Sequence, residues 1–283
     1  MKEYTTDKIR NVALVSHNGA GKTTFVERAL FDTKVTTRMG SVQSGSAVMD
    51  FEEEEMERNS SISTAVAPIE WKGHKLNLLD TPGYVDFVGE VNAALRVAEG
   101  AFVFVEATAG VEVGTEIVWQ AAEDAGLPRC IVVNKMDREN VRVNRVLESI
   151  NTHFDSNFVQ LQLPIGEGPD FKGVIDLFSM EARLGENDER APIPDDLADA
   201  AEEARFELVE AAAEGEDALI EKYLEGEELT DEEMVRGLRK AIMQGLVVPI
   251  LYAAPEPGIA VVPVLQAMMR LVPAPNQVED FTV

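Results

Sequence analysis

Cysteine and long hydrophobic runs are the scarcest features of this sequence. Cys130 is the single cysteine in 283 residues, so an internal disulfide is excluded, and its place in the apolar run Arg129-Cys130-Ile131-Val132-Val133 predicts a buried thiol. No apolar run approaches the roughly 20 residues that span a bilayer, and the N-terminal residues lack the apolar core of a signal peptide. We therefore expect a cytoplasmic protein with no membrane partner.

Positive charge and histidine are also scarce. The 25 lysines and arginines face 51 aspartates and glutamates, for a net charge of −26. A surface this acidic repels bare phosphate backbones, which argues against direct, non-specific binding of nucleic acid, and we interpret most acids as solvated faces of helices. The three histidines, His17, His74 and His153, lack the spacing of metal ligands, and we expect packing, hairpin-surface and helix-end positions for them.

The pattern along the chain predicts an α/β fold with a doubly wound, mostly parallel sheet and an inserted α+β subdomain. Short β-branched runs alternate with amphipathic ones up to about residue 154, which is typical of a parallel sheet covered by helices. The predicted strands cover residues 9–15, 62–71, 76–79, 101–105 and 131–133. Helices are predicted after Gly21, Gly83, Val113 and Asp137, with Gly100 and Gly126 at helix C-caps.

A second unit interrupts this alternation. Strand-like segments at 158–165 and 171–178 precede a stretch rich in glutamate and alanine, with helices predicted to begin at Asp195 and Thr230. A strand at 246–252 and a helix at 260–271 then return to the first pattern. We thus assign residues 1–155 and 247–275 to a nucleotide-binding domain and 156–246 to the inserted subdomain, with 276–283 as the truncated start of a following domain.

One motif predicts phosphate binding. The segment Ser16–Thr23 follows a strand, opens a helix, and differs from the P-loop pattern of P-loop NTPases at its first glycine only. Its amides and the helix N-terminus would cradle phosphates, Lys22 would reach the β and γ phosphates, and the Thr23 hydroxyl would bind Mg²⁺. The predicted contact residues are His17, Asn18, Gly19, Ala20, Gly21, Lys22, Thr23 and Thr24.

Two further motifs narrow the ligand to GTP or GDP. Asn134-Lys135-Met136-Asp137 ends an apolar strand, where Asp137 would accept hydrogen bonds from N1 and the exocyclic amine of guanine. Asn134 would brace the P-loop, and Lys135 would lie along the base. The second motif, Asp80-Thr81-Pro82-Gly83, also ends a strand. It would place the Asp80 carboxylate near Mg²⁺ and the Gly83 amide at the γ phosphate. Proline and glycine here also fit an ordinary turn, which is compatible with a switch that changes its backbone conformation.

The order of these motifs resembles the translational GTPases, and the whole chain resembles elongation factor G. Matching segments include Val85-Asp86-Phe87, 171–177 (FKGVIDL), 219–229 (LIEKYLEGEEL) and 248–251 (VPIL). The resemblance implies a GTPase domain with its inserted subdomain, normally followed by four further domains. It also implies a monomeric factor that couples GTP hydrolysis to ribosomal translocation or a related step, with the ribosome as partner.

The chain departs from the family at four positions. Tyr84 replaces the histidine that orients the attacking water, and a phenol is a poor base near neutral pH. Ser61 replaces the threonine that ligates Mg²⁺, Gly19 replaces an acidic P-loop residue, and Ala254 aligns with the serine before the usual base contact. The predicted catalytic residues are Tyr84, Lys22 and Gly83, and the predicted metal ligands are Thr23, Ser61 and Asp80. Either Ala254 completes the predicted base contacts after a one-residue shift, or that contact is lost.

These departures leave three hypotheses open. The first is a ribosome-stimulated GTPase of the elongation factor G type. The second is a ribosome-associated GTP-binding switch with weak or no hydrolysis, and the third is a release-factor or ribosome-protection branch of the same family. We expect the acidic run Glu52-Glu53-Glu54-Glu55 to be solvated and mobile in all three.

Overall fold

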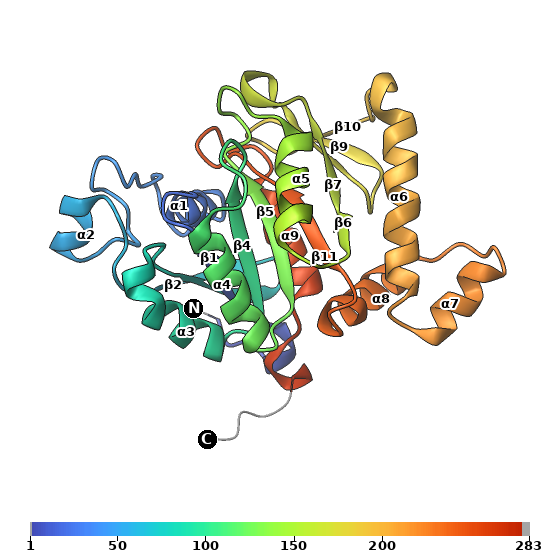
Figure 1. Ribbon diagram of the computed structural model, residues 1–283, viewed down its shortest axis with the longest axis horizontal. Helices are drawn as coiled ribbons and strands as arrows, with labels where there is room; N and C mark the ends of the chain where they lie inside the picture. Colours follow the sequence, from blue (N-terminus) through green and yellow to red (C-terminus); the bar gives the residue numbers. More distant parts are fainter. Residues whose placement is uncertain (1, 279–283) are drawn as a thin grey trace. The chain divides into compact units, whose positions relative to one another are not determined.

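The chain folds around one large and one small β-sheet. A computed structural model describes residues 2–278 (Figure 1). The large sheet has seven strands in the order β2-β3-β1-β4-β5-β11-β6, and the small one has four in the order β10-β9-β8-β7. The strands of the large sheet are β1 (Ile9–Ser16), β2 (Ala65–Trp71), β3 (His74–Asp80), β4 (Gly100–Glu106), β5 (Arg129–Asn134), β6 (Phe158–Gln160) and β11 (Val248–Tyr252).

The pairing within the large sheet is mostly parallel. Strand β1 pairs in parallel with β3 and β4, and β11 pairs in parallel with β5 and β6. Strand β2 is antiparallel to β3, and the two form a hairpin that turns at Lys72 and Gly73. The predicted α/β fold class is therefore confirmed. None of the helices within residues 2–278 is both long and apolar enough to cross a bilayer.

The chain divides into two compact units. The first unit comprises the residues up to Phe104, Glu112–Leu127 and those from Leu265 on, and the second comprises Val105–Val111 and Pro128–Val264. The helices of the first unit are α1 (Lys22–Asp32), α2 (Glu53–Arg58), α3 (Val88–Val97) and α4 (Val113–Asp124), with short 3-10 turns at Thr6–Lys8, Val85–Phe87 and Pro275–Gln277. The α1 helix contacts β1, β2 and β3, while α3 and α4 contact β1 and each other.

The core of the first unit lies where apolar strand residues meet these helices. Val12, Leu14 and Phe25 are fully buried, and the Phe25 ring meets Phe104 edge-on at 5.2 Å between centroids. Gly126 has a φ of 64°, in the left-handed region, as predicted for a helix C-cap. The prediction for Gly100 was wrong: α3 ends at Val97, and Gly100 is already the first residue of β4.

The long connection between α1 and β2 carries the short helix α2, well away from the sheet (Figure 1). The acidic run predicted to be solvated and mobile forms the start of this helix. Glu52 and Glu55 close a capping box, and Glu55 has no exposed surface at all. Glu52, Glu53 and Glu54 are exposed, as expected, and the expectation was wrong for Glu55 alone, because its carboxylate accepts hydrogen bonds from backbone amides rather than from water.

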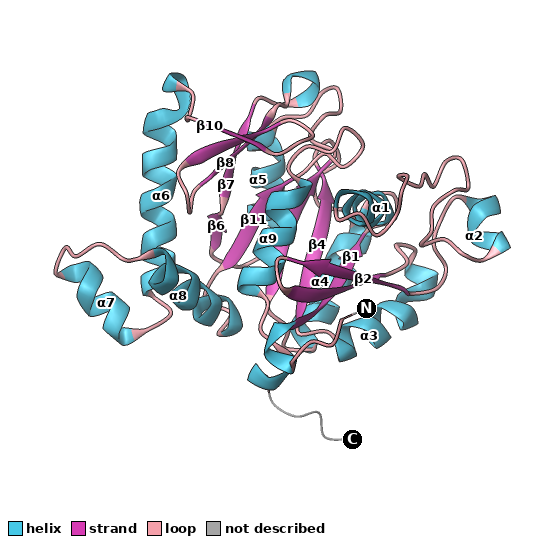
Figure 2. Cartoon of the chain, turned by 180° about the vertical axis from the view of Figure 1, so that it is seen from behind, coloured by secondary structure: helices cyan, strands magenta, loops and turns pink. Residues whose placement is uncertain are grey.

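The second unit contains the small sheet and most of the remaining helices. The small sheet is antiparallel and consists of β7 (Gln162–Ile165), β8 (Gly173–Asp176), β9 (Glu181–Leu184) and β10 (Glu189–Ala191). Its helices are α5 (Val143–His153), α6 (Ala198–Ala213), α7 (Asp217–Leu224) and α8 (Asp231–Met243), and α9 (Val261–Leu271) begins in this unit. Figure 2 shows α7 and α8 beside one end of the long helix α6, and both contact α6.

The predicted single strand at 158–165 is two strands. Strand β6 pairs with β11 of the large sheet, Leu161 follows, and β7 joins the small sheet. Residues 158–160 thus belong to the large sheet although they fall in the segment predicted as the insertion. The predicted domain boundaries stay predictions, and residues 279–283 of the proposed following domain lie outside the described residues. Thr230, where the last helix of the insertion was predicted to begin, is the N-cap of α8 and forms a capping box with Glu233.

Candidate functional site

The P-loop joins β1 to α1 in the first unit. Strand β1 ends at Ser16 and α1 begins at Lys22. Gly19 and Gly21 have φ angles of 81° and 91°, a conformation that a side chain would strain, which explains glycine at both positions. No side chain caps the N-terminus of α1, so its first-turn amides face the loop with the positive end of the helix dipole. This arrangement favours an anion.

The predicted phosphate lysine is buried at the base of this loop. Lys22 is 6% exposed, and its Nζ donates to the Ser16 hydroxyl at 2.6 Å, which in turn donates to the His17 carbonyl at 2.5 Å. Burial lowers the pKa of Lys22 to about 8, against the opposing charge of Asp80. The His17 ring lies against Gly114, with Nε2 at 3.5 Å from Glu112 Oε1.

The three predicted metal ligands gather beside Lys22. Asp80 is 1% exposed, and neither of its carboxylate oxygens has a hydrogen-bond partner. The hydroxyls of Thr23 and Ser61 lie 3.2 Å apart. Burial raises the pKa of Asp80 to about 7, while the charge of Lys22 and the nearby Thr23 hydroxyl act to lower it. A buried carboxylate without a hydrogen-bond partner, beside hydroxyl oxygens, is a donor set that suits Mg²⁺, because a divalent cation would stabilise its ionised form.

A fourth oxygen donor at this place was missed by the sequence reasoning. Asp50 is 3% exposed, and its Oδ1 accepts a hydrogen bond from the Ser61 hydroxyl at 2.7 Å. Burial raises the pKa of Asp50, against the hydrogen bond from Ser61. The residue sits at the edge of the acidic run, so the sequence offers no signal that separates it from the exposed acids around it.

The turn after β3 packs directly on the P-loop. A Cβ built on Gly83 would lie 2.6 Å from Asn18 Cα and 2.9 Å from Asn18 N, so glycine alone fits there. The Thr81 hydroxyl donates to the Leu14 carbonyl at 2.7 Å and ties the same turn to β1. Tyr84 follows this turn with 47% of its surface exposed. The structure thus brings Asp80 and Gly83 to the P-loop, as the motif predicts.

Buried carboxylates hold the connection between α1 and β2 in place. Glu27 of α1 has no exposed surface and accepts three backbone hydrogen bonds, from Gly40 at 3.2 Å, Val48 at 2.6 Å and Met49 at 3.0 Å. Glu55 Oε1 accepts from the amides of Ile62 at 2.8 Å and Ser63 at 3.1 Å. Ser61 is therefore positioned by carboxylates that bind the chain on both sides of it.

Glu27→Gln is expected to destabilise the protein by about 1–3 kcal/mol, because the new NH₂ group faces a backbone donor and one buried amide loses its acceptor. The free energy of unfolding from urea titration measures this. Glu57→Gln, at an exposed position of α2, is the control and should change nothing measurable. An unchanged midpoint for Glu27→Gln would show that the connection does not depend on this carboxylate.

The base-recognition motif lies in the second unit, at the end of β5. Asn134 is fully buried, and its carbonyl accepts from the Ala107 amide at 2.9 Å. Lys135 has a φ of 60°, unusual for a residue with a side chain. The Met136 amide donates to the Ala253 carbonyl at 3.2 Å, and Asp137 is half-buried. These bonds fix the loop that carries the predicted base ligand.

The predicted base contact at Ala254 meets an obstacle. The Ala254 amide donates to the Ile259 carbonyl at 3.0 Å, and the Ile259 amide returns a bond to the Ala254 carbonyl at 2.9 Å. Pro255 has no amide to offer. A hydrogen bond from Ala254 to guanine would require the first of these bonds to be shared or broken, and this contact stays a prediction.

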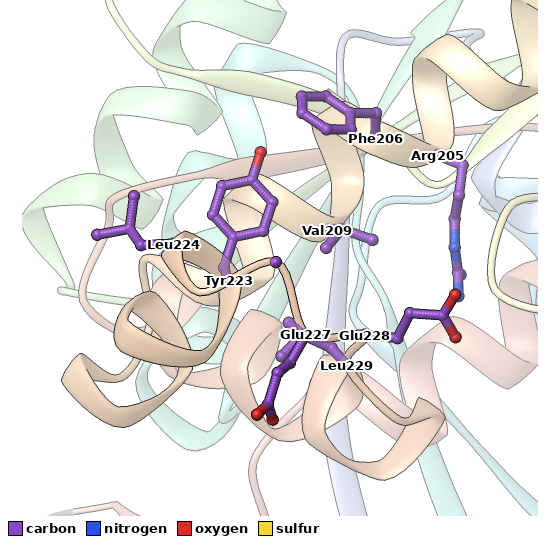
Figure 3. Close-up of a pocket in the computed structure, with 9 residues that line it drawn as sticks. Arg205, Phe206, Val209, Tyr223, Leu224, Glu227, Glu228 and Leu229 are labelled. Atoms are coloured by element: carbon purple, nitrogen blue, oxygen red, sulfur yellow. The ribbon is translucent and has the colours of Figure 1, made fainter.

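A cavity of about 640 Å³ lies in the second unit, and none of the residues predicted to bind nucleotide lines it. Figure 3 shows Phe206 and Tyr223 on one side of it and the acidic pair Glu227 and Glu228 on another. Arg205 borders the cavity, but its guanidinium donates to the carbonyls of Leu177 and Phe178. The charged residues that line the cavity are Arg205, Glu227 and Glu228, which do not form a cluster suited to phosphate chemistry.

Comparison with known proteins agrees with the motifs. The family model of the elongation factor Tu GTP-binding domain matches residues 7–274. A crystal structure of a protein from Thermus thermophilus is similar, with 39% sequence identity and a TM-score of 0.90 over 96% of this chain. The matched region is 41% of that protein, so this chain spans less than half of its length. The match over almost all of its residues shows that the chain belongs to the elongation factor Tu GTP-binding domain family, the translational GTPases.

Proposed function

We propose that this chain is the GTP-hydrolysing domain of a translation factor of the elongation factor G type, which acts in ribosomal translocation or a related ribosome step. The observation that carries the proposal is the buried Asp80 carboxylate, which has no hydrogen-bond partner and belongs to the same unit as the Thr23 and Ser61 hydroxyls and the P-loop. Leaving such a group unpaired is costly unless a cation compensates it.

The residues of the first unit would act on the phosphates and their metal. Thr23, Ser61 and Asp80 would hold Mg²⁺, which when bound supplies positive charge that neutralises the phosphate oxygens. Lys22 would add a second positive charge, and the Gly83 amide would donate to the γ phosphate. In the second unit, Asp137, with Asn134 and Lys135, would select guanine.

The position of Tyr84 makes a second function worth testing. Its phenol can orient a water molecule by hydrogen bonding but cannot take a proton from it efficiently near neutral pH. Ser61 donates its hydroxyl hydrogen to Asp50 and keeps its oxygen lone pairs for a metal, so this contact does not weaken the metal site. The phenol at position 84 therefore carries the alternative, a GTP-binding switch with slow hydrolysis. The release-factor and ribosome-protection branches share this domain, and sequences beyond it would separate them.

Tyr84→His is expected to speed ribosome-stimulated hydrolysis by about tenfold or more, because histidine supplies the missing base. Single-turnover GTP hydrolysis by the full-length protein, with and without ribosomes, measures this, and Tyr84→Phe serves as the matched control for loss of the hydroxyl. Stimulated hydrolysis by the wild type supports the enzyme. Nucleotide binding without stimulated hydrolysis, restored by histidine, supports the switch, and equal rates for wild type and Tyr84→His would refute the importance of this position.

A further inference from the structure

The side chain of Lys135 is held by an acid that the sequence motifs do not include. Glu106 is the last residue of β4, and its Oε2 lies 2.8 Å from Lys135 Nζ. The Thr108 hydroxyl donates to the other oxygen, Oε1, at 2.9 Å. Each partner of the ion pair is 25% exposed, so water screens the pair only in part. All three residues belong to the second unit.

The lowered pKa of the Glu106 carboxyl is consistent with its pairing with Lys135. Burial alone would raise the pKa of its carboxyl, but the hydrogen bonds from Lys135 and Thr108 together outweigh burial and lower it. The carboxylate is therefore ionised at neutral pH and available to the ammonium group. Arg138 adds to the same electrostatic effect.

Lys135 is thus fixed at both ends. Its backbone sits in the left-handed region, the preceding carbonyl of Asn134 accepts from Ala107, and its own carbonyl accepts from the Arg138 amide at 3.1 Å. A non-glycine residue in this conformation is strained and persists only where its surroundings impose it. With its tip held by Glu106, the long side chain has little rotamer freedom left to lose on binding.

We propose that Glu106 is a positioning residue for guanine recognition, which holds the Lys135 ammonium so that the aliphatic stem is ready to cover the face of the base. This inference rests on the proposed function, since it assumes that Lys135 meets a guanine nucleotide. Ordering a lysine beforehand removes a cost that binding would otherwise carry. Without Glu106, the Lys135 side chain would lose conformational entropy when it orders over the base.

Whether removal of the Glu106 charge weakens or tightens nucleotide binding distinguishes a positioning role from simple charge repulsion. A carboxylate near an anionic ligand repels it, so removing that charge should tighten nucleotide binding if Glu106 did nothing else. If Glu106 positions Lys135, removing its charge should instead weaken nucleotide binding. Glu106→Gln keeps the shape, the backbone and an oxygen for Thr108, but it replaces the charged partner of Lys135 with a neutral one.

Glu106→Gln in the full-length protein is expected to raise the Kd for Mg·GDP roughly three- to tenfold, the size expected for ordering one long side chain, through faster dissociation. The Kd for Mg·tripolyphosphate, which has no base, should stay unchanged. Glu181→Gln is the matched control, because it removes a carboxylate that pairs with Arg190 at 3.1 Å in the same unit and should leave both ligands unaffected. Fluorescence-detected stopped flow and calorimetry give these constants.

A double-mutant cycle with Lys135→Ala tests whether Glu106 acts through the lysine. In the Lys135→Ala background, Glu106→Gln should no longer weaken GDP binding. An unchanged or tighter Kd for GDP in Glu106→Gln, an equal loss for GDP and tripolyphosphate, or an undiminished loss without Lys135 would each overturn the inference. Failure of the wild type to bind GDP at all would instead refute the proposed function.

Discussion

Asp137→Asn is expected to weaken binding of GDP by roughly 10²- to 10⁴-fold and to shift the preference of the protein toward xanthosine diphosphate. The carboxylate is expected to accept hydrogen bonds from both N1 and the exocyclic amine of guanine. Asparagine accepts one of them and turns its NH₂ group toward the other donor. Xanthine carries a carbonyl in place of that amine, so the same NH₂ group finds an acceptor.

Competition binding with GDP, xanthosine diphosphate and ADP on the full-length protein measures the change. Glu139→Gln is the matched control, since it removes an exposed carboxylate two residues farther along the chain. It should leave the order of the three nucleotides unchanged. Wild-type protein that binds ADP as well as GDP, or an Asp137→Asn variant with undiminished affinity for GDP, would contradict the assignment of Asp137 to the base.

Gly83→Ala is expected to lower GTP hydrolysis by about 10²-fold, the loss that a misplacement near 1 Å can cause in a catalytic site. The added Cβ would lie 2.6 Å from Asn18 Cα. Because this neighbour is a backbone atom and not the end of a flexible side chain, the backbone of either the turn or the P-loop must move. Because the P-loop amides and the Gly83 amide would meet the same phosphates, GTP should lose affinity more than GDP. Single-turnover hydrolysis and the two dissociation constants measure this.

Gly89→Ala is the control for this substitution. Gly89 lies inside α3, and a Cβ there would meet no atom within 4 Å. Alanine should leave hydrolysis unchanged and raise stability by about 0.5–1 kcal/mol, because glycine is a poor helix former. If Gly83→Ala hydrolyses GTP as fast as Gly89→Ala does, the close packing of the turn on the P-loop has no part in catalysis.

The motifs and the hydrophobic pattern predicted the parts of the site whose geometry is local. A P-loop after a buried strand is one continuous segment, and the turn Asp80–Gly83 follows its strand directly, so sequence order alone placed them. Within the first unit, Gly83 packs on Asn18, the Thr23 and Ser61 hydroxyls lie 3.2 Å apart, and Asp80 lies near Lys22, while the roles of these residues stay predictions. The α/β class followed from periodicity in the same way.

The features that sequence did not predict depend on distant partners. Glu27, Asp50 and Glu55 look like solvated acids because a carboxylate carries no sign of which backbone amides will surround it. The break at Leu161 was missed because one strand-like segment can contribute to two sheets. The engaged Ala254 amide depends on a bond to Ile259 across a loop, and spacing alone does not reveal it.

The position of Glu27 on α1 has a thermodynamic consequence. Thr23 and Glu27 are four residues apart, so they lie one turn apart on the same face of one helix. One would meet the metal, and the other holds the segment from Gly40 to Met49. A ligand bound at Thr23 and a partner bound to residues 40–49 would therefore act on the same helix. Any coupling free energy between the two would be reciprocal, so each would change the affinity of the other by the same factor.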